Sequence, residues 1–192
     1  MRLEPLAVSF IMTFLAEFGD KTQLSIIALC LRGKVLPTFL GAILAFAAVN
    51  GPSVLAGKAL AEHLPIFWVR VAAGLVFLVL GLFTLASKGA EMVKVGESKV
   101  SVLSSFVVVS LMELGDKTQL SAVTLAAEYG LPIPVFLGVM LALTAVTGIG
   151  VTLGASVFRL LPPSYVRVGA ALLFILYGVV SLLSAFGLSI HG

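Results

Sequence analysis

A nine-residue segment with two carboxylates occurs twice in the chain. Residues 17–25 read EFGDKTQLS, and residues 113–121 read ELGDKTQLS. Each copy places a glutamate and an aspartate three residues apart, so on a continuous helix both carboxylates would point to one side. Carboxylate, hydroxyl and amide oxygens are hard ligands, which suit Mg²⁺, Ca²⁺ and Mn²⁺ better than Cu⁺ or Zn²⁺. The repeated segment, called the acidic motif below, therefore predicts a site for a divalent cation.

Brought together, the two acidic motifs would form one site. Their four carboxylates and two lysines leave a formal charge of −2, which one divalent cation balances. The predicted metal ligands are the four carboxylates, Glu17, Asp20, Glu113 and Asp116. Hydroxyl and amide groups are predicted to complete or orient the ligand shell, and these are Thr22, Thr118, Gln23 and Gln119. Lys21 and Lys117 are predicted to balance the charge, either as counter-ions to the empty site or at a helix interface. Clustered carboxylates in a low dielectric hold protons more tightly, so protons and metal would exclude each other.

The residues around both motifs are apolar. The chain of 192 residues is 60% hydrophobic and 11% charged, with a mean hydropathy of +1.18, whereas a soluble domain has about 25% charged residues. Most of its surface must therefore face lipid. Six apolar segments meet or exceed the roughly 20 residues that a helix needs to cross a bilayer: 5–31, 36–61, 66–86, 100–127, 133–158 and 164–186.

The similarity between the halves extends beyond the motif. Residues 39–41 and 136–138 both read FLG, and residues 69–71 and 166–168 both read VRV. Three helices per copy is an odd number, so the second copy enters the membrane from the opposite side, as in secondary transporters. We expect an all-α integral membrane protein with six transmembrane helices in two inverted three-helix repeats, at 1–86 and 100–192, joined by a cytoplasmic linker at 87–99.

A charge at mid-membrane costs about 2.5–3.5 kcal/mol, so the motif charges should converge near the midplane. The alternative is that Glu17–Lys21 and Glu113–Lys117 are ion pairs, four residues apart on one helix, that only fix packing. Two further interruptions, at residues 50–52 (NGP) and 147–150 (TGIG), are predicted either to expose carbonyls to an ion or to form packing kinks.

Loop charges predict the orientation. Seven lysines and arginines flank one side of the predicted helices and three flank the other, and the richer side should be cytoplasmic, which places both termini outside. Arg70 and Arg167 should reach the lipid headgroups. The lone Cys30 and two histidines offer no zinc site, and neither an enzyme nor nucleic-acid binding is indicated.

The two acidic motifs, at residues 17–22 and 113–118, resemble the signature of the Gdt-type family of membrane proteins, and the resemblance covers essentially the whole chain. It implies a divalent cation/proton exchanger that moves Mn²⁺ or Ca²⁺ out of the cytosol without a cofactor. Glu17, Asp20, Glu113 and Asp116 would then be the ion-binding carboxylates. The short N-terminus and short central loop are similar to those of bacterial members, which resemble manganese exporters of the inner or plasma membrane.

The expected function is therefore export of Mn²⁺, with Ca²⁺ as the second candidate, in exchange for protons. The expected partners are the ion, protons and the bilayer, and a homo-oligomer is compatible with the sequence. Two rival functions stay open: a six-helix exporter of small organic solutes such as amino acids, and a non-transporting membrane scaffold.

Overall fold

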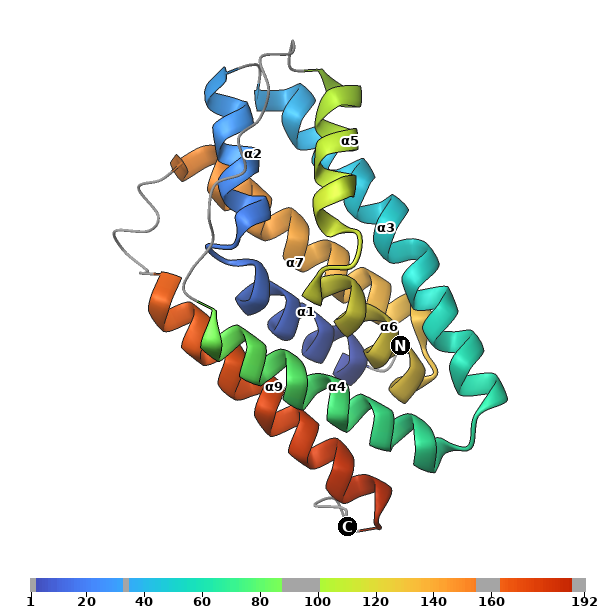
Figure 1. The fold of residues 1–192 in the computed structure, drawn as a ribbon. Coiled ribbons are helices and arrows are strands. Elements are labelled where there is room, and N and C mark those ends of the chain that lie inside the picture. Colours follow the sequence, from blue (N-terminus) through green and yellow to red (C-terminus); the bar gives the residue numbers. More distant parts are fainter. Residues whose placement is uncertain (1–2, 33–34, 88–100, 155–162, 188–192) are drawn as a thin grey trace.

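The computed structural model describes residues 3–32, 35–87, 101–154 and 163–187, and all regular elements in these ranges are helices (Figure 1). In chain order they are α1 (Leu3–Glu17), α2 (Lys21–Arg32), α3 (Val35–His63), α4 (Ile66–Ala86), α5 (Val102–Glu113), α6 (Lys117–Tyr129), α7 (Pro132–Leu153) and α9 (Pro163–Ala185). The predicted linker, apart from Ser87, lies outside the described residues, as do most of the charges on which the orientation was based.

Four of these helices, α3, α4, α7 and α9, are long and apolar enough to cross a membrane. Each also carries large apolar side chains that are more than half exposed, such as Leu44, Leu75, Leu141 and Leu172. Side chains of this kind on the outside of a helical bundle are what a lipid solvent requires. The protein is therefore an all-helical integral membrane protein.

Both segments that contain an acidic motif are broken helices. The first ends at Glu17 and restarts at Lys21, and the fourth ends at Glu113 and restarts at Lys117. Gly19 and Gly115 lie in each break with φ of 78° and 76°, a left-handed conformation that glycine adopts without steric cost. The expectation of one continuous helix, with the glutamate and aspartate on one face, was therefore wrong for both motifs.

The other two interruptions do not unwind their helices. Helix α3 continues through Pro52, and α7 continues through residues 147–150 to Leu153. The Asn50 side-chain amide donates to the Phe46 carbonyl at 3.1 Å, so this side chain bonds within its own helix. In the part of the chain that the structure describes, the breaks occur at the acidic motifs.

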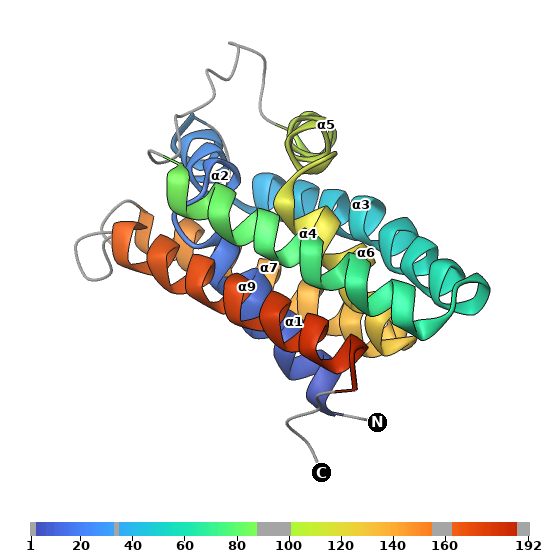
Figure 2. The same ribbon diagram turned by 60° about the horizontal axis from the view of Figure 1, so that its bottom comes forward.

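The closest helix pairs join the two halves of the chain: α1 packs on α7, α5 on α3, and α4 on α9. Glycines allow the close approach, since a Cβ at Gly41 would lie 2.5 Å from the Val102 carbonyl oxygen, and one at Gly178 2.8 Å from that of Gly74. Both ribbon views show α4 and α9 side by side as a pair, with α1 and α7 behind them in Figure 2. The glutamates that precede the two breaks, Glu17 and Glu113, are buried, whereas Leu114 and Gly115 within the second break are exposed.

Candidate cation site

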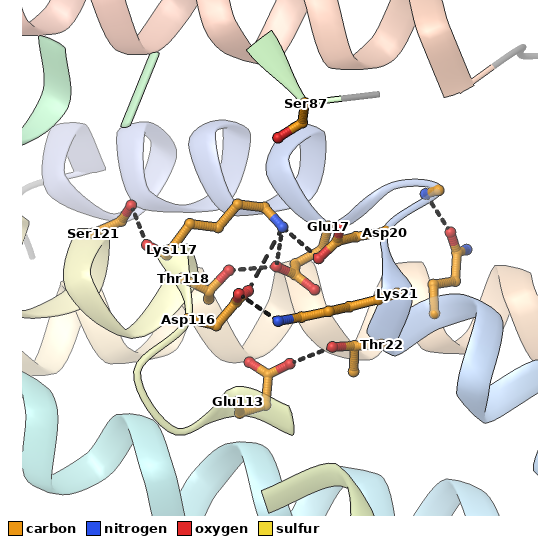
Figure 3. Close-up of polar contacts among 12 residues, drawn as sticks. Glu17, Asp20, Lys21, Thr22, Ser87, Glu113, Asp116, Lys117, Thr118 and Ser121 are labelled. Carbon is orange, nitrogen blue, oxygen red and sulfur yellow. Dashed lines mark hydrogen bonds and ion pairs between the residues drawn. The ribbon is translucent and has the colours of Figure 1, made fainter. Parts of the chain in front are cut away.

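The two acidic motifs meet at their breaks and exchange hydrogen bonds (Figure 3). The Thr118 hydroxyl donates to Glu17 Oε1 at 2.5 Å, and the Thr22 hydroxyl donates to Glu113 Oε1 at 2.9 Å. Each threonine is the second residue of the helix that follows its break, so it reaches across to the glutamate that ends the other motif's first helix. All four residues are buried.

Three carboxylates from the two motifs form a compact group. One oxygen each from Glu17, Asp20 and Asp116 lies within 4.8 Å of the others. Glu17 is fully buried, and the two aspartates are partly exposed. Glu113 lies outside this group, bonded to Thr22, and its Oε2 is buried without a hydrogen-bond partner among the described residues.

The ammonium group of Lys117 contacts all three carboxylates of the group. Its Nζ lies 3.4 Å from Glu17 Oε1 and 3.6 Å from Asp116 Oδ2, and it forms a short contact with Asp20 Oδ2. Lys21, by contrast, pairs with Asp116 Oδ1 at 2.9 Å and is more exposed, 38% against 14% for Lys117. The alternative of ion pairs within one helix is therefore wrong for the described residues, because both lysines pair across the motifs.

The two glutamines fix the breaks. Gln23 Oε1 accepts from the Gly19 N–H at 2.6 Å, and its amide donates to the Val146 carbonyl of α7 at 3.1 Å. Gln119 Oε1 accepts from the Gly115 N–H at 2.7 Å, and its amide donates to Ser53 Oγ of α3 at 3.0 Å. Neither Val146 nor Ser53 is marked by the sequence as a site residue. Of the two predicted roles, completing the shell or orienting it, these bonds favour orientation.

A cavity of about 930 Å³ lies between the motifs, the C-terminal end of α4 and the N-terminal end of α9. Its polar lining consists of Asp20, Lys21, Asp116 and Lys117 from the motifs, and of Thr84, Ser87, Ser164 and Arg167 from the ends of α4 and α9. Thr84 Oγ1 and Arg167 Nε are buried without hydrogen-bond partners in the described structure. Arg167, which we expected at the headgroups, thus lines the access to the charged group.

Charged side chains that converge at two broken helices in an apolar helical bundle are typical of membrane transport proteins. The chain belongs to the family described as divalent cation/proton antiporter GDT1, whose model matches residues 5–92 and 101–189. The family matches twice, once in each half, and each match includes one acidic motif.

Among individual proteins, the chain is 36% identical over 73 residues to "Divalent cation/proton antiporter GDT1" of Saccharomyces cerevisiae, which covers 38% of this chain and 26% of that protein. It is 32% identical over 132 residues to the "Putative manganese exporter" of Vibrio cholerae, covering 65% of this chain and 62% of that protein. The chain therefore matches less than two thirds of the length of either relative. No solved structure matches.

Proposed function

We propose that the protein exports a divalent cation, Mn²⁺ first and Ca²⁺ second, from the cytosol in exchange for protons. The observation that carries the proposal is the group of three carboxylates, drawn from both acidic motifs, whose oxygens lie within 4.8 Å of one another at the two helix breaks. The family description supports the exchange of cation for proton, and the name of the Vibrio cholerae relative supports manganese. Oxygen ligands fit both Mn²⁺ and Ca²⁺.

The proposed ligands are the carboxylates of Glu17, Asp20 and Asp116, with Glu113 as a fourth that turns its unpartnered Oε2 towards the ion. Thr22 and Thr118 hold the two glutamates, and Gln23 and Gln119 hold the glycine turns that separate glutamate from aspartate. In this arrangement the motif supplies both the ligands and the groups that orient them.

Lys117 has the role of a tethered cation in this proposal. Its ammonium group contacts the same three carboxylates that would bind the metal, so an incoming divalent ion has to displace it. The cavity beside Lys117 gives the side chain room to move away while still charged. The site would thus carry a compensating positive charge when no metal is bound.

The proposal includes six membrane crossings in two inverted repeats, 1–86 and 100–192, with each broken helix pair, α1–α2 and α5–α6, counted as one crossing. The support is that the two halves of the chain make equivalent contacts with each other. Thr22 donates to Glu113 and, equivalently, Thr118 donates to Glu17. Helix α1 packs on α7 and, equivalently, α5 packs on α3. The loop charges suggest that the cavity opens to the cytoplasm, so this structure would represent a state that accepts metal from inside a bacterial plasma membrane.

The decisive experiment is transport in proteoliposomes with an imposed pH gradient, comparing Mn²⁺, Ca²⁺ and Mg²⁺. We expect Mn²⁺ flux driven by the gradient, and we expect Glu113→Gln to lower it more than about tenfold, since a contact to a charged group is worth about 1.5–3 kcal/mol. The matched control is Glu62→Gln, an exposed glutamate that pairs with Lys58.

Each rival function predicts a different result. An exporter of organic solutes would show no metal flux and would tolerate the loss of Glu113. A scaffold would leave the metal sensitivity of cells unchanged when Glu17→Gln is combined with Lys21→Met. Wild-type protein that carries no divalent ion under a pH gradient would refute the proposed function.

A further inference from the structure

A further carboxyl group is enclosed by helices outside the acidic motifs. Glu128 lies one residue before the end of α6, on the side of the molecule where α1 begins and α9 ends, called the terminal side below. Its Oε1 accepts a hydrogen bond from Ser181 of α9 at 2.6 Å, and the Tyr177 hydroxyl, also of α9, donates to the same carboxyl group. Its Oε2 is buried and has no hydrogen-bond partner among the described residues.

The polar groups near Glu128 come from α1, α4, α6 and α9. Arg70 of α4 is the nearby cation, but its Nη1 donates to the Ser184 carbonyl at 3.3 Å. No lysine or arginine of the described ranges forms an ion pair with Glu128. Tyr129, which follows Glu128 in α6, donates its hydroxyl to Glu4 of α1 at 3.4 Å. The carboxyl group is therefore held by hydroxyl groups and has no paired cation.

Ser181 links this carboxyl group to the contact between α4 and α9. Its hydroxyl lies 2.6 Å from Glu128 Oε1 and 3.1 Å from the Arg70 carbonyl oxygen. A hydroxyl has one proton to donate and can also accept. An ionised Glu128 takes that proton, so the Arg70 carbonyl loses this second donor and keeps its backbone hydrogen bond within α4. A protonated Glu128 can instead donate to Ser181, which then donates to Arg70, and both bonds are made.

The corresponding residues at the other end of the α4–α9 pair line the cavity. With an offset of 97 residues, Arg70 and Ser181 correspond to Arg167 and Thr84, which line the cavity and hold buried atoms without partners in the described structure. The carboxyl group itself is not repeated, because Arg32 stands 96 residues before Glu128. An acid is thus present beside Arg70 and Ser181 and missing from the repeat-related position beside the cavity.

We propose that Glu128 is a second proton-binding site, separate from the acidic motifs, which closes the terminal side of the transporter when it is protonated. The proton comes from water on the terminal side and returns there. Protonation adds one hydrogen bond between α4, α6 and α9, and ionisation removes it. The inference rests on the proposed function, because it assigns this side as the one where metal leaves and protons arrive.

The test measures thiol accessibility in detergent-solubilised, full-length, metal-free protein. Cys30→Ser removes the native thiol, and Ser184→Cys or Ser87→Cys places a reporter at matching positions of the two sides. We expect the reporter at 184 to react about fivefold more slowly with a membrane-impermeant reagent when Glu128 is protonated, the factor given by one net hydrogen bond. Labelling rates are measured between about pH 5 and 8. The rate at position 184 is divided by the rate at position 87, which corrects for the ionisation of the reporter thiol itself.

Glu128→Gln mimics the protonated acid and should keep position 184 slow at every pH. Ser181→Ala removes the coupling hydroxyl and should abolish the pH dependence without touching the carboxyl group; Glu62→Gln is the control. Identical pH profiles in wild type and Glu128→Gln would overturn the inference, including the case in which both are uniformly slow. Because no metal is involved, this failure is distinct from an absence of Mn²⁺ transport, which would refute the proposed function.

Discussion

Lys21 and Lys117 occupy the same position of the two acidic motifs but have different contacts. Lys117 contacts three carboxylates and is largely buried, whereas Lys21 is more exposed and, among the described residues, forms an ion pair with Asp116 only. In a transporter built from an inverted repeat, the two copies exchange their environments when the protein switches between its inward-open and outward-open states. The contacts of Lys21 and Lys117 would then be exchanged in the other state. Under the proposed function, the contacts of Lys117 seen here belong to the state in which the cavity is open to accept metal.

The first prediction concerns Lys117→Met. Without the ammonium group, Mn²⁺ no longer displaces a bound charge, so the apparent affinity for Mn²⁺ should rise by about tenfold or more, the equivalent of at least one contact to a charged group. Isothermal titration with MnCl₂ on purified protein measures this. Lys21→Met is the matched control and should change the affinity less, because Lys21 is more exposed and contacts one carboxylate. Weaker Mn²⁺ binding by Lys117→Met would contradict the tethered-cation role.

At the scale of helices, the breaks depend on backbone conformation at a single glycine each. Nothing lies within 4 Å of a Cβ built at Gly115, but its φ is 76°. A side chain there meets no neighbour and instead strains the left-handed backbone. The position of Glu113 relative to Asp116 thus depends on one residue that can adopt this conformation.

Gly115→Ala should lower the free energy of unfolding by about 1–2 kcal/mol and reduce Mn²⁺ binding, because the two carboxylates shift against each other. Gly148→Ala is the control: this glycine also has an open Cβ position but lies inside α7 with helical backbone, where alanine is favoured by about 0.5–1 kcal/mol. Thermal unfolding in detergent compares the two variants. Equal stability of Gly115→Ala and Gly148→Ala would mean that a side chain does not strain the left-handed turn at Gly115.

The sequence predicts the apolar helices well but not the breaks within them. Hydropathy over about 20 residues identifies segments 36–61 and 66–86 as helices, and α3 and α4 confirm them. The same average cannot detect a one-turn break inside a segment that stays apolar on both sides. A usable signal was present, since Gly-Asp places an aspartate as N-cap before a new helix, as Asp116 does for α6.

The partners of each lysine and glutamine could not be predicted, because they depend on which helices pack together. Glycines such as Gly41 and Gly178 decide that packing by shape, and the repeat pattern does not reveal which surfaces they join. The sequence therefore predicts the charged residues of the candidate site. It does not predict Ser53 and Val146, whose hydrogen bonds to the two glutamines depend on how the helices pack.

At the scale of the whole molecule, the two sequence halves are interlocked. Each of the closest helix pairs takes one member from each half, so the halves cannot rock as separate bodies, as a simple inverted-repeat picture would suggest. The cavity lies between the α4–α9 pair and the motif helices. We therefore expect α4 and α9 to move together against the remaining helices during transport.

A thiol placed in the cavity tests this arrangement. In a Cys30→Ser background, a bulky thiol reagent on Ser164→Cys should block most Mn²⁺ flux, because Ser164 lines the cavity between α4, α9 and the motifs. Leu172→Cys is the control on the same helix, exposed on its outer surface and absent from the cavity lining. Flux after labelling is compared in proteoliposomes. Equal inhibition at both positions would show that the cavity is not the route to the site.

The interlocked halves also constrain how the chain is made. Glu17 lies in the first helix, but Lys117 and Thr118, which contact its carboxylate, are synthesised about a hundred residues later. Until then the N-terminal half holds an acid without its native partners, so its helices cannot reach their final packing during translation.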